Sequence, residues 1–200
     1  MSVRPSATSL AKPRLALRDI ACLRGDRLLF EGLGFALGPG ESLLVAGPNG
    51  AGKSSLLRLI AGLLAPAAGR IEREGRIALA AEAPALDMER PLRAALAFWA
   101  RIDGAESEAL DGALAAMDLA PLEDVPVAML STGQRKRAVL ARTIASGADI
   151  WLLDEPGNGL DAAALDRLGR AMAIHLDQGG IVVAASHQPI GLSPTREIRL

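Results

Sequence analysis

The chain has 200 residues, of which 50% are apolar and 22% charged. This balance is typical of a folded globular protein and excludes an intrinsically disordered chain. The formal net charge of −1 excludes a global basic field that would draw the protein to nucleic acid or anionic lipid. Cys22 is the one cysteine, so an internal disulfide is excluded and a reducing compartment is favoured.

Neither end of the chain indicates secretion or membrane insertion. The first residues, MSVRPSATSLAKPRLALRD, lack the continuous apolar run of a signal peptide. The long uncharged stretch QGGIVVAASHQPIGLSPT contains Gln, His, Ser, Gly and Pro, which do not suit the hydrocarbon core of a bilayer. We therefore expect a cytoplasmic protein without a membrane-spanning segment.

The first part of the chain predicts several strands and one helix. Residues 14–30 alternate and then run apolar around an RGDR turn, as two antiparallel strands would. The short apolar run 41–47 ends in glycine and indicates a buried strand. Residues 53–64 place leucines and isoleucine at helical spacing, and 75–81 form another candidate strand.

From about residue 83 to residue 130 the pattern changes. Residues 90–104 and 107–119 form two amphipathic helices with no strand between them, which indicates a helical insertion. Strands and helices then alternate again, which implies a mostly parallel sheet with crossover helices. These last elements are a helix over 133–146, a strand over 149–155, a helix over 161–176, a strand over 180–186 and a short end at 196–200.

These elements predict an α/β fold. It has a mostly parallel core sheet, N-terminal antiparallel strands and a helical subdomain. We expect one domain over residues 1–200. Its core lobe would comprise about 1–82 and 147–200, and its helical subdomain about 83–146.

The stretch GPNGAGKS follows a predicted strand and opens a predicted helix, which is the context of a P-loop with the pattern G-x-x-x-x-G-K-[ST]. Its glycines let successive amides point at phosphate oxygens. Lys53 would contact the β- and γ-phosphates, and the Ser54 hydroxyl is a hard oxygen ligand suited to Mg²⁺. The alternative is a chance glycine-rich turn. The predicted phosphate-binding residues are Gly47, Pro48, Asn49, Gly50, Ala51, Gly52, Lys53, Ser54 and Ser55.

The apolar strand WLLDE ends in two carboxylates at the edge of the sheet where ligands bind in such folds. Asp154 would hold Mg²⁺, and Glu155 would orient and deprotonate an attacking water. The alternative is a pair of surface carboxylates that cap the next turn. Together with the P-loop, this strand predicts ATP and Mg²⁺ as the cofactors.

A second anion site is predicted at LSTGQRKR, where a helix begins. Ser131 offers a hydroxyl and Gly133 allows close backbone approach, although an ordinary helix cap would have the same residues. The cations Arg135, Lys136, Arg137 and Arg142 follow it. We expect them to form a solvated helix face with ion pairs rather than a nucleic-acid surface.

The order GPNGAGKS, LSTGQ, WLLDEP, GLD and SHQ resembles the nucleotide-binding domain of ATP-binding cassette (ABC) ATPases over essentially the whole chain. This resemblance implies a P-loop NTPase fold and ATP hydrolysis in a head-to-tail homodimer that sandwiches two ATP molecules. Ser131, Gly133 and Gln134 would contact the γ-phosphate bound by the second subunit. Thr132 stands where the usual LSGGQ signature has its first glycine.

The resemblance also implies roles for single residues. Asp161 would be the D-loop aspartate that links the two sites, and His187 the switch histidine of a catalytic set that includes Glu155 and Lys53. By contrast, we expect His175 to be a surface residue. Two positions depart from the family pattern: Glu82, a further candidate metal ligand, replaces the Q-loop glutamine, and Arg24 replaces the aromatic ring that stacks on adenine.

Within the ABC family, residues 21–64 and the sequence SHQPI resemble the ATP-binding subunit of cytochrome c maturation, or heme export, systems. This implies a peripheral location at the cytoplasmic face of the bacterial inner membrane, with integral membrane subunits of the CcmB and CcmC kind. ATP hydrolysis would release a heme-loaded chaperone, and no nucleic-acid partner is expected.

Three alternatives remain open. The chain could serve another ABC exporter, act on nucleic acid or ribosomes as a soluble ABC ATPase, or bind nucleotide without catalysis. For a transporter, the helical insertion and the groove beside Glu82 would receive a cytoplasmic helix of the membrane subunit. The apolar residues Leu92, Ala95, Leu96 and Trp99 would suit such a groove, but core packing would explain them equally well.

Overall fold

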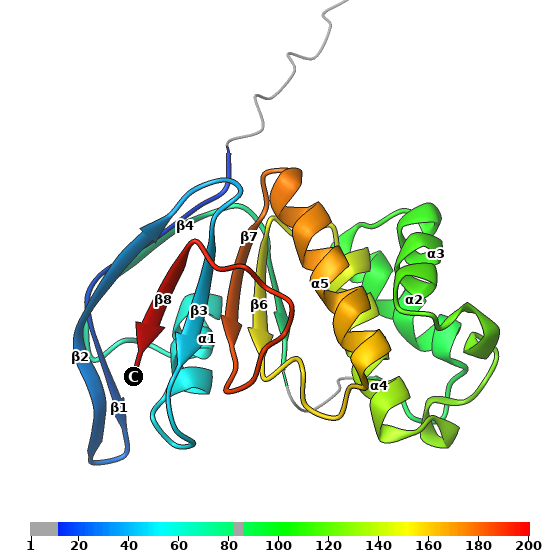
Figure 1. The fold of residues 1–200 in the computed structure, drawn as a ribbon, viewed down its shortest axis with the longest axis horizontal. Coiled ribbons are helices and arrows are strands. Elements are labelled where there is room, and N and C mark those ends of the chain that lie inside the picture. The colour runs from blue at the N-terminus through cyan, green and yellow to red at the C-terminus, as the bar shows by residue number, and fades with distance from the viewer. Residues whose placement is uncertain (1–11, 82–85) are drawn as a thin grey trace, which may run out of the picture.

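The structure is a computed structural model that describes residues 12–81 and 86–200 (Figure 1). A small antiparallel sheet lies at one side, with the strand order β2-β1-β4. The expected hairpin is present as β1 (Arg14–Arg24) and β2 (Arg27–Leu37). The third strand, β4 (Ala68–Glu74), was not expected, because its polar sequence AGRIERE contains no apolar run. Antiparallel pairing with β1 supplies its hydrogen bonds instead.

The central sheet has the order β5-β6-β7-β3-β8, and every neighbouring pair is parallel. This confirms the predicted mostly parallel core sheet. Its strands are β3 (Ser42–Ala46), β5 (Ile77–Ala80), β6 (Ile150–Asp154), β7 (Ile181–Ala185) and β8 (Arg196–Arg199).

Helices cover both faces of this sheet, because its inner strands are apolar on both sides. Ile150 and Leu152 of β6 pack in the same cluster as α1 (Lys53–Ala61), whereas Trp151 and Leu153 pack with α5 (Ala162–Asp177). Successive side chains of a strand point to opposite faces, so β6 contributes to both halves of the core.

The helical part lies on the far side of α5 from the antiparallel sheet (Figure 1). It comprises α2 (Leu92–Asp103), α3 (Ser107–Ala116) and α4 (Thr132–Ala145), with short 3₁₀ turns at Ala120–Leu122 and Val127–Met129. Leu92, Ala95 and Leu96 are buried there, so core packing accounts for these three residues. Over the described ranges 12–81 and 86–200, no helix is both long enough and apolar enough to cross a bilayer.

The expectation that His175 is a surface residue is wrong. Its side chain is only 9% exposed, and its ring stacks on that of Trp151 with centroids 3.9 Å apart and planes inclined by 9°. Gly180 makes room for this stack, because an added Cβ would lie 2.2 Å from Nε2 of His175. The sequence shows only that His175 lies on a helix. Its burial results from the packing of α5 against Trp151 of β6.

The expectation of a solvated face with ion pairs on α4 is wrong for Lys136 and Arg142, whereas Arg137 forms an ion pair with Asp118 at 3.4 Å. Lys136 is buried. Arg137 donates to the carbonyl oxygens of Met117 and Asp118 at 2.8 and 2.9 Å. The guanidinium of Arg142 lies 3.5 Å from the ring centroid of Trp99, and burial lowers its pKa. These side chains therefore hold α4 against its neighbours within the protein.

The buried imidazole predicts a pH-dependent stability. Burial lowers the pKa of His175 below its ordinary value of 6.5, although main-chain groups of Ile181 and Asp149 and the Asp149 charge oppose this shift. Between the two pKa values the unfolded chain binds the proton and the folded chain does not, so stability falls as the pH drops below about 6.5. We expect His175→Gln to remove this loss, which amounts to at most about 1.4 kcal/mol per pH unit for one proton.

Urea unfolding at several pH values between about 7.5 and 5.5 measures this difference. The gap in unfolding free energy between the wild type and His175→Gln should narrow as the pH falls. Two curves that stay parallel over this range would contradict the assignment of His175 as a neutral core residue.

Candidate functional site

The P-loop connects β3 to α1, as its sequence context predicts. Gly50 and the helix cap Gly52 have φ angles of 80° and 108°, which suit glycine far better than other residues. No side chain caps the start of α1. The first amides of this helix therefore remain available to an anion, and the helix dipole favours a negative charge at the same place.

The first glycine of the loop has a structural reason of its own. A Cβ at Gly47 would lie 2.6 Å from the carbonyl oxygen of Leu200, at the end of the chain. Leu200 is held there because its amide donates to the carbonyl oxygen of Ala46, beside the pairing of β8 with β3. A larger residue at position 47 would therefore displace β8 as well as the loop.

The carboxylates that end β6 lie directly beside the P-loop. Asp154 is 6% exposed, and its Oδ1 accepts a hydrogen bond of 2.9 Å from the Ser54 hydroxyl. Glu155 has a φ of 44°, in the left-handed region that few non-glycine residues adopt. Its amide donates to the carbonyl oxygen of Ala185 at 2.9 Å, which ties the strained residue to β7.

The side chains of Lys53 and His187 both contact the Glu155 carboxylate. Lys53 Nζ lies 3.4 Å from Glu155 Oε1, and His187 Nδ1 lies 2.8 Å from Glu155 Oε2. Lys53 is 6% exposed and also donates to the carbonyl oxygens of Gly47 and Pro48 at 2.8 and 3.2 Å. An ammonium, a carboxylate and an imidazole thus share one small volume at the start of α1.

This volume is a cavity of about 360 Å³. Besides predicted residues, it is lined by two that sequence reasoning missed, Leu29 and Asn158. The amide of Asn158 donates to the carbonyl oxygen of Glu155 at 3.2 Å, and the turn-forming sequence PGNG could have pointed to it. Leu29 lies within an ordinary apolar strand and carries no such signal. The lining residues are Leu29, Asn49, Gly50, Gly52, Lys53, Ser54, Ser55, Glu155, Asn158 and His187.

Several predicted residues lie elsewhere. Arg24 is exposed at the end of β1, pairs in register with Arg27, and is not among the lining residues. Asp161 caps α5 by accepting a 2.7 Å hydrogen bond from the Ala164 amide. Glu82 lies outside the described residues.

The start of α4 is also separate from this cavity. Ser131 and Gln134 form a capping box: the Ser131 amide donates to Gln134 Oε1 at 2.7 Å, and the Gln134 amide donates to Ser131 Oγ at 3.2 Å. The helix-cap interpretation is therefore correct, and it is compatible with anion binding because Ser131 and Thr132 remain exposed. Gly133 lies against the chain itself, since a Cβ there would be 3.0 Å from the carbonyl oxygen of Gly159.

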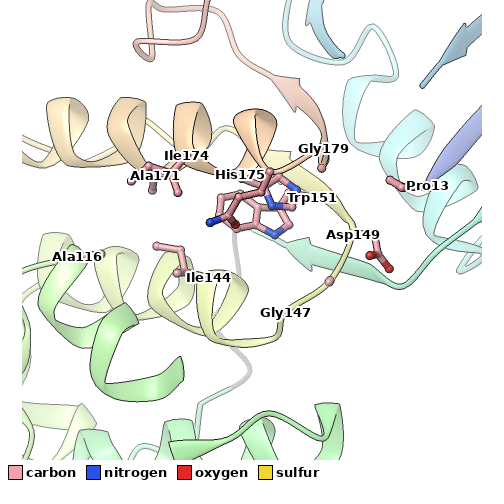
Figure 2. Close-up of a pocket in the computed structure, with 13 residues that line it drawn as sticks. Pro13, Ala116, Ile144, Gly147, Asp149, Trp151, Ala171, Ile174, His175 and Gly179 are labelled. Carbon is pink, nitrogen blue, oxygen red and sulfur yellow. The ribbon is translucent and has the colours of Figure 1, made fainter. Parts of the chain in front are cut away.

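A second cavity, of about 310 Å³, lies at the other end of the sheet (Figure 2). Trp151 and His175 form its centre, and segments that precede β6 and β7 form its edge. The described residues that line it include no lysine or arginine.

The geometry suits phosphate chemistry at the first cavity. An uncapped helix start and a buried ammonium can hold phosphates. A carboxylate in contact with an imidazole can accept a proton from a water beside the terminal phosphate. The hydrogen-bonded pair of Ser54 and Asp154 supplies two hard oxygen atoms of the kind that Mg²⁺ prefers.

Comparison with known proteins agrees with this arrangement. The family model described as ABC transporter matches residues 30–158. The cytochrome c biogenesis ATP-binding export protein CcmA of Sphingopyxis alaskensis is 60% identical over 92% of this chain and 95% of that protein. The protein of the same name from Zymomonas mobilis is 52% identical over 98% of this chain and 89% of that protein.

The fold is shared with solved structures. One that is described as the ATP binding subunit of an ABC transporter superposes with a TM-score of 0.80 at 24% identity, and covers 86% of this chain and 79% of that one. Fold, family model and relatives agree: the chain belongs to the ABC transporter family, among the cytochrome c biogenesis ATP-binding export proteins called CcmA.

Proposed function

We propose that the protein hydrolyses ATP with Mg²⁺ as one half of a head-to-tail homodimer, in a membrane complex of cytochrome c biogenesis. The observation that carries this proposal is the meeting of Lys53, Glu155 and His187 in one cavity at the start of α1. A chain that only bound nucleotide would need the P-loop, but not a carboxylate paired with an imidazole beside it.

In this proposal the residues of the cavity divide the reaction between them. The first amides of α1 and the ammonium of Lys53 hold the β- and γ-phosphates. Glu155 accepts a proton from the attacking water, and His187 orients that water and the γ-phosphate together. Because Lys53 lies 3.4 Å from Glu155, a γ-phosphate at the ammonium would place the water within reach of the carboxylate.

The metal would be held by Ser54 and Asp154, whose oxygen atoms already lie 2.9 Å apart. When bound, Mg²⁺ neutralises charge that develops on the phosphate oxygens. Glu82 as a further ligand stays a prediction, and so do Arg24 as the adenine contact and the division into a core lobe and a helical subdomain.

The start of α4 supports the dimer. Ser131 is exposed and does not line the cavity of its own chain, although its helix presents a positive dipole end. A second copy, bound head to tail, would bring its nucleotide to this helix start. Gln134 would act by holding Ser131 in place, and Asp161 would lie between the two sites.

The relatives bear a name that describes an export protein, which supports integral membrane subunits as partners. We propose that these subunits are of the CcmB and CcmC kind. The outer face of α2 supports such contact, since Phe98 and Ile102 are 50% and 61% exposed. Trp99, which lies between them in the sequence, lines two neighbouring surface cavities. A cytoplasmic helix of a membrane subunit would cover this face and keep the protein peripheral at the inner membrane.

Replacing Glu155 by glutamine removes the base and keeps the shape of the side chain. We expect the turnover number for ATP in the assembled complex to fall at least about a hundredfold, because proton transfer to the carboxylate is lost. ATP binding should persist, as the P-loop is untouched. Phosphate release and equilibrium binding of labelled ATP measure the two effects, and unchanged turnover would refute the catalytic role.

A mixed dimer tests whether sites are shared between subunits. One protomer carries Glu155→Gln and the other Ser131→Arg, so a shared arrangement concentrates both defects in one site and leaves the other intact. We expect about half of the wild-type turnover if the two sites act independently, whereas each homodimeric variant loses at least about a hundredfold.

Tagged co-purification isolates the mixed dimer for this assay. Ser107→Arg, the same substitution at the exposed start of α3, is the matched control and should keep full turnover. A mixed dimer as inactive as both homodimeric variants would contradict shared sites that act independently.

Replacing Ser54 by alanine removes one predicted metal ligand. We expect the Mg²⁺ concentration for half-maximal turnover to rise at least about tenfold, the usual cost of a weakened metal site. Ser107→Ala, the same substitution at the exposed start of α3, is the matched control and should keep the wild-type Mg²⁺ dependence. Equal Mg²⁺ dependence of Ser54→Ala and the wild type would exclude Ser54 as a ligand.

A further inference from the structure

Buried full charges are concentrated at one place in the described part of the chain. Apart from His175 and the Cys22 thiol, the buried ionisable side chains there are Lys53, Lys136 and Asp154. Lys53 and Asp154 belong to the phosphate and metal site, but the proposed reaction gives Lys136 no task. Its side chain is 9% exposed, and burying an ammonium is costly unless its surroundings compensate the charge.

Lys136 lies between the two anion sites of the chain. It projects from the second turn of α4, five residues after the exposed cap Ser131. Its Nζ donates to the main-chain carbonyl oxygen of Asp154 at 3.4 Å. The residue that follows this carbonyl is Glu155, whose backbone is strained at a φ of 44°.

A second contact joins the same two segments. Gly133, in the first turn of α4, lies against the carbonyl oxygen of Gly159, where an added Cβ would be 3.0 Å away. Gly159 belongs to the loop that runs from Glu155 to Asp161, and the Asn158 amide closes this loop onto the Glu155 carbonyl oxygen. The start of α4 therefore touches the segment from Asp154 to Asp161 near both of its ends.

These contacts connect elements that face different nucleotides. In the proposed dimer, the start of α4 meets the ATP of the second copy, whereas Glu155 acts on the ATP of its own chain. A displacement of the α4 start would reach Glu155 through Lys136 and Gly133. The contact that carries this coupling is the hydrogen bond from Lys136 Nζ to the main-chain carbonyl oxygen of Asp154, one residue before Glu155.

We propose that Lys136 is a positioning residue of the ATPase, which couples the α4 start to the backbone of Asp154 and Glu155. This inference rests on the proposed function. It assigns Lys136 no contact with the nucleotide. Its loss should thus impair turnover and the cooperativity between the two sites, and leave the binding of ATP to each P-loop intact.

Lys136→Met separates this role from a merely structural one. Methionine has a similar length and suits a buried position, so the variant should unfold at the same urea concentration as the wild type or a higher one. We expect the turnover number of the assembled complex to fall about tenfold, as when a positioning contact is lost. The dissociation constant for ATP should stay within about twofold of the wild type, and the Hill coefficient should approach one.

Two further variants complete the test. Lys12→Met removes the same charge at an exposed position and should leave turnover unchanged. Lys136→Arg keeps a cationic donor and should recover part of the turnover that Lys136→Met loses. Wild-type turnover and cooperativity in Lys136→Met would overturn the inference.

The same experiment distinguishes the failure of this inference from that of the proposed function. If Glu155→Gln abolishes turnover and Lys136→Met does not lower it, the ATPase stands and the positioning role is refuted. If the wild-type complex binds ATP without turnover, the proposed ATP hydrolysis is refuted, and the positioning role of Lys136 is refuted with it. A loss of stability in Lys136→Met that matches its loss of turnover would assign Lys136 to the core alone.

Discussion

The structure depends on the parallel alignment of β3 and β6 on either side of β7. Because all three strands run in one direction, the loops at their carboxyl ends meet at one edge of the sheet. Ser54 and Asp154 are separated by 100 residues in the sequence and yet share a hydrogen bond of 2.9 Å there. The ion pair between Lys53 and Glu155 follows from the same alignment. Hydrolysis at this site would be impossible in a fold that separated the two loops.

The strand β6 is central because it is buried on both faces. At its start Trp151 stacks on His175, and at its end Asp154 contacts Ser54 from one side and Lys136 from another. Helices packed on opposite faces are thus joined through five residues of backbone. Helices on both faces of the sheet therefore contact Asp154, the residue before Glu155.

The P-loop and the start of α4 differ in how many polar groups of their own chain surround them. The P-loop is surrounded by an ammonium, a hydroxyl and a carboxylate from its own chain. The start of α4 offers a capped helix end and an exposed hydroxyl at Ser131, with no share in that cavity. We infer that the second site is half of an interface. Its capping box already satisfies the Ser131 and Gln134 amides within the chain, so that a second copy would bind a helix start that is already formed.

The sequence by itself determined four strands of the central sheet (β3, β5, β6 and β7), the P-loop and the carboxylates that end WLLDE, because apolar runs and short motifs depend on nearby residues. Only the tertiary structure decided which polar side chains are buried. His175 and Lys136 occupy helix faces that looked exposed, and both are buried by contacts with β6 or the loop that follows it. The polar strand β4 exists because β1 supplies its hydrogen bonds. The burial of these side chains and the pairing of β4 depend on residues far away in the sequence, so no local sequence pattern predicts them.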